Sequence, residues 1–247
     1  MLNELVALPG EGRVFEQVFL PGFADCAPSG RIRLDALARW LQDIAYEDVV
    51  DAELADRAVW VVRRTRFRVE RFPRAGEACA VATFCSGLGR MWAERRTSIR
   101  AIAGEAGVEA VSLWVHLDPA TWRPIPLGED ESSVYGESAR GRRVTARLRH
   151  PSPTGDEQRR HWKFRAAELD IAGHINNAAY WTPLEEELLA GPEPTRLDVE
   201  LEYRTPSQPG DKLVLCDGRR RWIVGDEVHA SIVLADAGGS APRPGSD

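Results

Sequence analysis

The sequence has few of the residues on which metal, redox and disulfide chemistry depends. Among 247 residues there are only four cysteines and five histidines. The cysteines, Cys26, Cys79, Cys85 and Cys216, form no CxxC pair, and no histidine stands at the spacing that would complete a zinc site. We therefore expect four thiols in a reducing compartment, without chemistry of their own, and neither a metal nor an organic cofactor.

Long apolar runs and excess positive charge are also missing. No stretch of about 18 apolar residues could span a bilayer, which argues against a membrane protein. Residues 1–10 contain no basic segment followed by an apolar one, so we see no signal or transit peptide and expect a cytoplasmic protein. The net charge of −6 argues against nucleic acid as a partner, because such binding needs a basic surface.

Hydrophobic periodicity in the first half predicts one helix followed by a set of strands. Apolar residues recur at helical spacing over residues 31–50. Residues 59–72 alternate apolar and charged side chains, and three further runs, 78–89, 91–104 and 109–118, have strand-like composition between glycine breaks. A helix followed by an antiparallel meander is typical of the α+β class.

The second half repeats this plan after a stretch without periodicity. Between about residues 124 and 154, proline, glycine, serine and arginine dominate, which indicates a linker. A strand, a loop, a helix and further strands are then expected over residues 159–169, 170–177, 178–190 and 196–236. We predict an N-terminal domain over 10–130, a linker over 131–155, a C-terminal domain over 156–236 and a disordered tail over 237–247.

Several segments resemble one protein family. LDIAGHINNAAY, residues 169–180, resembles the active-site loop of hotdog-fold thioesterases, and residues 60–84 resemble the first strand-turn-strand of acyl-acyl-carrier-protein thioesterases. LARWLQDIAYEDV, residues 37–49, is similar to the first helix of that family, with its Leu-Gln-(Asp/Glu)-x-Ala core. With residues 111–127 and 197–204, the matches cover most of residues 13–216 in the family's order.

The resemblance implies both a fold and an activity. The expected fold is α+β, two tandem hotdog domains, each an antiparallel sheet wrapped around a long central helix. The resemblance places the catalytic loop in the second hotdog and much of the acyl pocket in the first. The implied reaction is hydrolysis of a fatty acyl thioester to a free fatty acid and the thiol of its carrier.

Within the loop, the candidate catalytic residues are Asp170, His174, Asn176 and Asn177. A carboxylate beside an apolar pocket can act as a general base on water or attack the carbonyl itself, and the sequence leaves both routes open. His174 is a candidate to orient water or bind the carbonyl, while the two asparagines either cap the helix or fix the loop. Backbone N–H groups of residues 175–178, at the start of the helix, are candidate oxyanion donors.

Two positions depart from the pattern of plant-type members of the family. Ala172 stands where those members carry Asn, and Thr205, Pro206 and Ser207 stand where an acidic residue is expected. Glu200 and Glu202 are candidates to compensate, and strand alternation puts both on one face. Otherwise the mechanism relies on Asp170, His174 and backbone donors, or the activity is weak.

Residues 140–165 carry an excess of positive charge that suits an acidic partner. The stretch contains nine basic residues and only two acidic ones. The basic residues are Arg140, Arg142, Arg143, Arg147, Arg149, Arg159, Arg160, Lys163 and Arg165, and the acidic ones are Asp156 and Glu157. An acyl carrier protein (ACP) is acidic and could dock on this stretch, although coenzyme A phosphates would also suit it. A solvated linker whose arginines pair with nearby carboxylates is the alternative.

Other functions stay open at this point. The chain could be an acyl-CoA thioesterase, or a non-catalytic acyl-binding hotdog protein, which the two departures favour. A double-hotdog hydratase is disfavoured by the Gly-His-x-Asn-Asn loop. The length of the acyl chain is open, as is the choice between a monomer and a homodimer.

Overall fold

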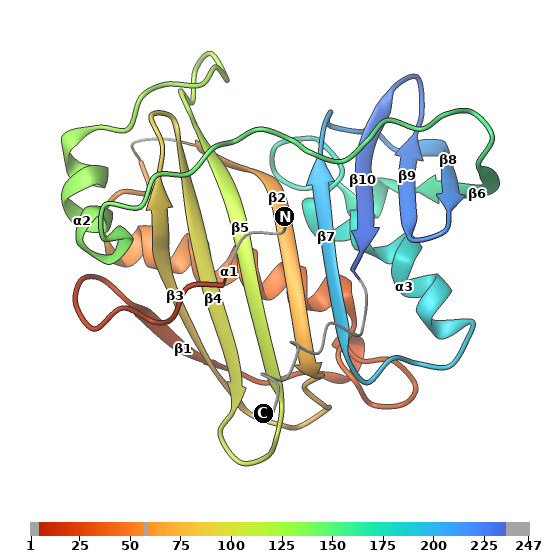
Figure 1. Ribbon diagram of the computed structural model, residues 1–247, viewed down its shortest axis with the longest axis horizontal. Coiled ribbons are helices and arrows are strands. Elements are labelled where there is room, and N and C mark those ends of the chain that lie inside the picture. Colours follow the sequence, from red (N-terminus) through yellow and green to blue (C-terminus); the bar gives the residue numbers. More distant parts are fainter. Residues whose placement is uncertain (1–4, 57–58, 236–247) are drawn as a thin grey trace, which may run out of the picture.

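The computed structural model describes residues 5–56 and 59–235, and its framework is one antiparallel sheet of ten strands. The strand order is β1-β3-β4-β5-β2-β7-β10-β9-β8-β6, so the two halves of the chain meet where β2 pairs with β7 (Figure 1). The first half supplies β1 (Phe15–Phe19), β2 (Val59–Arg71), β3 (Cys79–Leu88), β4 (Trp92–Ala101) and β5 (Gly107–Leu117). The second half supplies β6 (Gln158–Phe164), β7 (Leu197–Tyr203), β8 (Gly210–Asp217), β9 (Arg220–Val224) and β10 (Val228–Leu234). The expected strands and the α+β class are confirmed.

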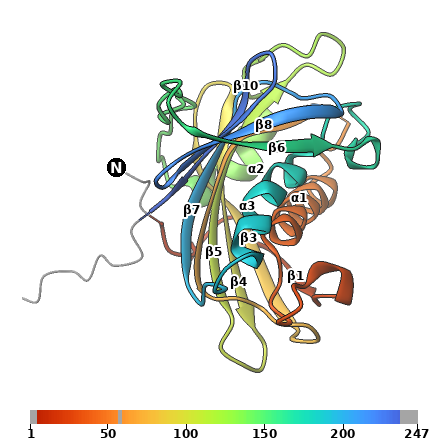
Figure 2. The ribbon, with the colours of Figure 1, turned by 90° about the vertical axis from the view of Figure 1, so that its right-hand side faces the viewer.

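Helices cover one face of this sheet, which we call the inner face. The predicted first helix is α1 (Leu34–Asp51), and the second half has a 3-10 turn, η3 (Asn177–Trp181), followed by the short helix α3 (Thr182–Leu189). Figure 2 shows α1 and α3 on the same side of the strands. The second helix is therefore much shorter than the first. Two more 3-10 turns, η1 (Phe23–Asp25) and η2 (Ala166–Glu168), precede α1 and the 170–177 loop.

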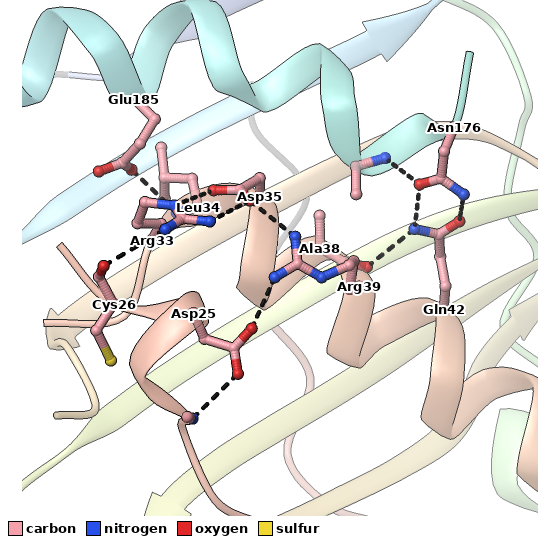
Figure 3. A network of polar contacts seen from close by, with 12 residues as sticks. Asp25, Cys26, Arg33, Leu34, Asp35, Ala38, Arg39, Gln42, Asn176 and Glu185 are labelled. Atoms are coloured by element: carbon pink, nitrogen blue, oxygen red, sulfur yellow. Dashed lines mark hydrogen bonds and ion pairs between the residues drawn. The ribbon is translucent and has the colours of Figure 1, made fainter. Parts of the chain in front are cut away.

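The apolar side of α1 explains why the helix lies where it does. Leu34, Leu37, Leu41 and Ile44 recur at helical spacing and are buried against the sheet. The first N–H of the helix, at Leu34, donates to Glu185 of α3 at 3.0 Å, so one half of the chain caps the helix of the other (Figure 3). Phe67 of β2 and Trp181 meet edge to face in a core that both halves share.

The expected irregular linker contains a helix, α2 (Glu129–Ala139), which the sequence analysis missed. Its first turn is acidic, and the Glu131 carboxylate accepts from the N–H of Gly128 at 2.8 Å, a capping arrangement that stabilises a helix start. Tyr135 and Ala139 pack with Cys85 of β3. An apolar face this short leaves too little periodicity in the sequence to be recognised.

After α2, residues 140–155 cross the outer face of the sheet, opposite α1 (Figure 1). Arg143 pairs with Leu88 of β3, and farther along the N–H groups of Arg149 and His150 donate to Glu202 of β7 at 2.5 and 3.0 Å. We call residues 140–155 the strap. Because sheet and core continue across both halves, the domain limits at 130 and 156 stay a prediction, and the tail, 237–247, lies outside the described residues.

The four cysteines are free thiols in two kinds of environment. Cys79 and Cys85 are buried, and burial raises the pKa of both to about 11, which disfavours the reactive thiolate. Cys26 and Cys216 are partly exposed. Across residues 5–56 and 59–235, no helix has the length and apolar character needed to cross a lipid bilayer.

Candidate active site

A cavity of about 780 Å³ lies between α1 and the inner face of the sheet. Apolar side chains make up much of its wall: Ala45, Val49, Val59, Trp60, Val62, Trp114, Leu117 and Ile175. Residues 170–177 and the end of β7 line one part of the cavity, and Tyr135 of α2 lines another. The volume and the apolar lining suit a small hydrophobic ligand such as an acyl chain.

A tight turn brings Asp170 and His174 to this cavity. The N–H of Gly173 donates to the carbonyl of Asp170 at 3.0 Å, and the N–H of Asp170 donates to the carbonyl of His174 at 3.0 Å. Gly173 has a φ of +74°, in the left-handed region that glycine adopts without strain. The Gly-His pair in the sequence is therefore the means by which the chain reverses here and presents both side chains.

Hydrogen bonds from its own loop hold the Asp170 carboxylate. One oxygen, Oδ1, accepts from the N–H of Ala172 at 2.9 Å, and the other, Oδ2, accepts from Nδ2 of Asn176 at 3.3 Å. Asp170 is half-buried and lines the cavity. The carboxylate therefore has a fixed direction and still faces the space in which a substrate would lie.

Asn176 both caps the following turn and fixes the loop, the two roles that the sequence left open. Its Oδ1 accepts from the N–H of Ala178 at 2.9 Å, which caps η3. The same side chain forms a two-way amide pair with Gln42 of α1, at 3.2 Å from Gln42 Nε2 to Asn176 Oδ1 and 3.3 Å from Asn176 Nδ2 to Gln42 Oε1 (Figure 3). The loop is thus tied to the helix of the first half.

Gln42 was missed as a site residue by sequence reasoning. It lies in the Leu-Gln-Asp-Ile-Ala segment, where Leu41, Ile44 and Ala45 are buried, and Gln42 itself is half-buried. Its side chain also donates to the carbonyl of Ala38, at 3.4 Å (Figure 3). A polar residue on the buried side of an amphipathic helix was the available signal, but the sequence does not say what it faces.

His174 and Asn177 also line the cavity, with different partners. Within the described part of the chain, the half-buried His174 ring makes no hydrogen bond, so both ring nitrogens are available to a ligand. The carbonyl of Asn177 accepts from the Tyr203 hydroxyl at 3.1 Å, and that hydroxyl accepts from Trp181 Nε1 at 3.0 Å. All four predicted residues therefore meet at one cavity, and their catalytic roles stay a prediction.

Most of the expected oxyanion donors are already used. The N–H of Ile175 donates to the backbone carbonyl of Ser207 at 3.0 Å, and the N–H of Asn176 donates to the backbone carbonyl of Glu168 at 2.8 Å. The N–H of Ala178 donates to Asn176 Oδ1. Among the described residues, Asn177 is the member of the 175–178 group whose N–H has no acceptor. The set of backbone candidates is thereby reduced to the Asn177 N–H.

The structure also shows what replaces the two unmatched family positions. Ala172 contributes its backbone N–H to Asp170. Thr205 and Pro206 line the cavity, and Ser207 holds the loop through its carbonyl. Where plant-type members carry an acidic side chain, this chain therefore has backbone contacts.

Glu200 and Glu202 do not compensate, because they lie on the outer face of the sheet. The two carboxylates share one face, as expected, together with His150 of the strap. These three side chains are close enough to hold a metal ion, but Glu202 already accepts from two N–H groups of the strap and Arg64 lies 3.7 Å from Glu200. The cluster therefore fastens the strap to β7 and has no part in the cavity.

Comparisons with known proteins identify one family. The family model of the acyl-ACP thioesterase N-terminal domain matches residues 12–135, and that of the C-terminal domain matches residues 152–231. An uncharacterized protein of Mycobacterium tuberculosis is 27% identical over 238 residues, which cover 93% of this chain and 95% of that protein. A chloroplastic oleoyl-acyl carrier protein thioesterase of Coriandrum sativum is 25% identical over 171 residues, 62% of this chain and 45% of its own length.

Two solved structures show the same fold at low identity. An acyl-ACP thioesterase from Bacteroides thetaiotaomicron superposes with a TM-score of 0.72 at 18% identity and covers 90% of this chain and 96% of that one. The 12:0-ACP thioesterase from Umbellularia californica gives a TM-score of 0.70 at 19% identity, covering 91% and 97%. Because the family models cover most of both halves, this chain belongs to the acyl-ACP thioesterase family and is a thioester hydrolase with two tandem hotdog domains.

Proposed function

We propose that the protein hydrolyses fatty acyl-ACP to a free fatty acid and the carrier thiol, with Asp170 as the reacting carboxylate. One observation carries the proposal: a carboxylate fixed by two hydrogen bonds lies at the wall of a cavity of about 780 Å³ with apolar sides. An acyl chain in that cavity would bring its thioester carbonyl to Asp170, and His174 and the Asn177 N–H line the same region.

Two reaction routes conserve atoms and charge. In the first, Asp170 takes a proton from water, the hydroxide bonds to the carbonyl carbon, and the C–S bond breaks. The sulfur leaves as a thiolate and takes the proton back from Asp170. In the second, an Asp170 oxygen attacks the carbonyl carbon and expels the thiolate, and water then hydrolyses the mixed anhydride, supplying the proton for the thiolate.

The neighbouring groups have supporting roles in either route. The carbonyl oxygen becomes negative when the tetrahedral intermediate forms, and the Asn177 N–H, with no acceptor of its own among the described residues, can donate to it. His174 can orient the water or donate to the same oxygen, since its ring nitrogens are available. Asn176 and Gln42 act as positioning residues that hold Asp170.

Charge near the loop supports an anionic carrier. Arg63 and Arg204 line the cavity beside the loop. Of the basic stretch 140–165, Arg142 pairs with Glu94 and Arg160 with Glu187, so these two act within the fold. The exposed members Arg159, Lys163 and Arg165 lie on β6 and the turn that leads into the 170–177 loop, and we place ACP docking there.

Thiol release from matched acyl-ACP and acyl-CoA thioesters tests this function. We expect turnover with both carriers and a preference for ACP. Charge reversal by Lys163→Glu with Arg165→Glu should raise KM for acyl-ACP several-fold at low salt and leave acyl-CoA less affected. Arg143→Glu with Arg147→Glu, at two exposed residues toward the other end of the basic stretch, changes the net charge by the same amount and is the matched control.

Two results would contradict the proposal. A preference for acyl-CoA would make the protein an acyl-CoA thioesterase. Capture of acyl chains without thiol release at any protein concentration would make it an acyl-binding protein, the alternative that Ala172 and the absent acidic residue favour.

A further inference from the structure

The far part of the cavity, next to α2, contains a charged and a phenolic side chain among apolar ones. Arg95 of β4 and Tyr135 of α2 line it, and Arg95 lies 5.5 Å from the centre of the Tyr135 ring. The Arg95 guanidinium is 2.6 Å from Asp48 Oδ2, and Asp48 Oδ1 is 2.6 Å from Arg13. The side chain of Asp48 is 1% exposed and that of Arg95 10%. A buried ion pair thus ends a cavity whose sides are apolar.

A donor without a partner lies on the neighbouring strand, β5. The indole N–H of Trp114, which lines the cavity from β5, is buried and has no acceptor among the described residues. Trp114 pairs across the sheet with Ala93, two residues from Arg95, so the two side chains are diagonal neighbours on the inner face, about 7–8 Å apart at Cα. Buried polar groups are normally hydrogen-bonded, and each one left unpaired costs about 1–3 kcal/mol.

The distance between this end of the cavity and the reaction centre matches the length of a medium-length acyl chain. Gln42, beside Asn176, and Asp48, beside Arg95, are six residues apart on α1, which is about 9 Å along the helix axis. Three strand spacings, about 14 Å, separate β2 from β3, on which α2 packs. An extended chain advances about 1.2 Å per bond, so these spans correspond to about 8–12 bonds.

A plain hydrocarbon suits this end poorly. Its terminal methyl group would lie next to Arg95 and the Tyr135 hydroxyl, which is buried and unpaired among the described residues, and would offer a hydrogen bond to neither, nor to the Trp114 N–H. A hydroxyl or oxo group would satisfy at least one of them. A carboxylate is less suitable, because Asp48 already compensates the Arg95 charge and a second anion would compete with it.

We propose that this end of the cavity binds a hydroxyl or oxo group carried near the far end of a medium-length acyl chain. The proposal rests on the proposed function and names its substrate class: acyl thioesters of about 8–12 carbons with a neutral hydrogen-bonding group close to the terminus. Arg95, Tyr135 and Trp114 are then specificity-determining residues. The alternative is that Arg95, Asp48 and Tyr135 only fasten α2 to the sheet.

The test is a ratio of kcat/KM values for matched substrates. Thioesters of the same length and carrier are compared with and without a terminal hydroxyl, over 8–12 carbons. One hydrogen bond gained in the complex predicts a three- to tenfold preference for the hydroxylated chain. Tyr135→Phe and Trp114→Phe, which remove single donors, should bring the ratio toward one. Trp162→Phe removes a comparable buried indole N–H on β6, likewise unpaired in the described part of the chain and away from the cavity lining, and should leave the ratio unchanged.

Binding gives a second readout that does not need turnover. Calorimetry with free fatty acids and their terminally hydroxylated counterparts should show the same preference, and the same loss in Tyr135→Phe. Equal or better binding and turnover of the plain chains at every length would overturn the inference. If no thioester is hydrolysed but the hydroxylated acids still bind more tightly, the inference holds and the proposed hydrolysis fails.

Discussion

The two halves of the molecule share one plan and differ in what they contain. The first has an 18-residue helix and strands of 10–13 residues in β2 to β5, and these elements contribute half of the residues that line the cavity. The second has an eight-residue helix and strands of five to eight residues, and it carries the Asp170–Asn177 loop. If the proposed function holds, the two halves differ in role: the first contributes the larger share of the cavity wall, and the second contributes the candidate reacting groups as well as part of the wall.

The comparison also shows where the halves depend on each other. Gln42 of the long helix pairs with Asn176 of the loop, and Glu185 of the short helix caps the long one at Leu34 (Figure 3). Neither half holds a complete site alone. Asn176 holds Asp170, and Gln42 of the other half holds Asn176.

The sharpest contrast lies between two acidic residues, one in each half. Asp170→Asn should lower kcat by about 10²–10⁴, because an amide can neither take a proton nor attack a thioester. Its stability should change little, since Asp170 is half-buried and its bonds are local. Thiol release and urea unfolding measured on the same sample check both expectations.

Asp48→Asn should do the opposite. It leaves the buried Arg95 without its counter-ion, while Arg13 keeps Asp51, so we expect a loss of about 3–5 kcal/mol in the free energy of unfolding. Thiol release by the fraction that remains folded should fall far less than in Asp170→Asn. A rate loss as large as that of Asp170→Asn, at unchanged stability, would show that the first half takes part in the chemistry.

A smaller effect is expected at the turn of the loop. Gly173→Ala forces a methyl group into a φ of +74°, where no atom blocks it, so the cost is conformational and about 1–2 kcal/mol. The loop should populate other conformations and kcat should fall, while the melting temperature drops by about 2–8 °C at most. Gly141→Ala, at a φ of +70° in the strap, is the matched control and should leave kcat unchanged.

The mildest effect concerns pH and the strap. Burial alone would raise the pKa of Glu200, but the hydrogen bond with His150, at 3.3 Å, and the charge of Arg64 hold that pKa below its usual value. A lowered folded-state pKa contributes stability above the unfolded-state value, about 4.3, and that contribution is lost as pH falls through the folded-state pKa. Glu200→Gln should therefore flatten the acid side of the unfolding curve; an unchanged curve would contradict this.

The sequence predicted the elements better than their junctions. Alternation in residues 59–72 and helical spacing in 31–50 were sufficient for β2 and α1, because each buries one regular face. α2 was missed, since its stability comes from packing on β3 and from a cap, neither of which has a long period. The second helix came out shorter than expected because its first residues form the 3-10 turn that follows the Asn176 cap.

The site shows the same limit. Asp170, His174, Asn176 and Asn177 of the loop motif line one cavity, and their catalytic roles stay a prediction. Gln42 lies 134 residues from Asn176 in the chain, so only the fold could reveal their pairing. The placement of Glu200 and Glu202 on the outer face was likewise beyond the sequence, because alternation gives shared faces and not which face is inside.

The most direct test of a site shared between the halves is a double-mutant cycle on Gln42 and Asn176, with kcat for thiol release as the readout. We predict that Gln42→Ala and Asn176→Ala each lower kcat, and that the double variant is little worse than Asn176→Ala, because Gln42 acts through Asn176. The account would be contradicted if the fall in kcat of the double variant equalled the product of the two single falls. Gln42 would then influence the reaction independently of the loop that it contacts.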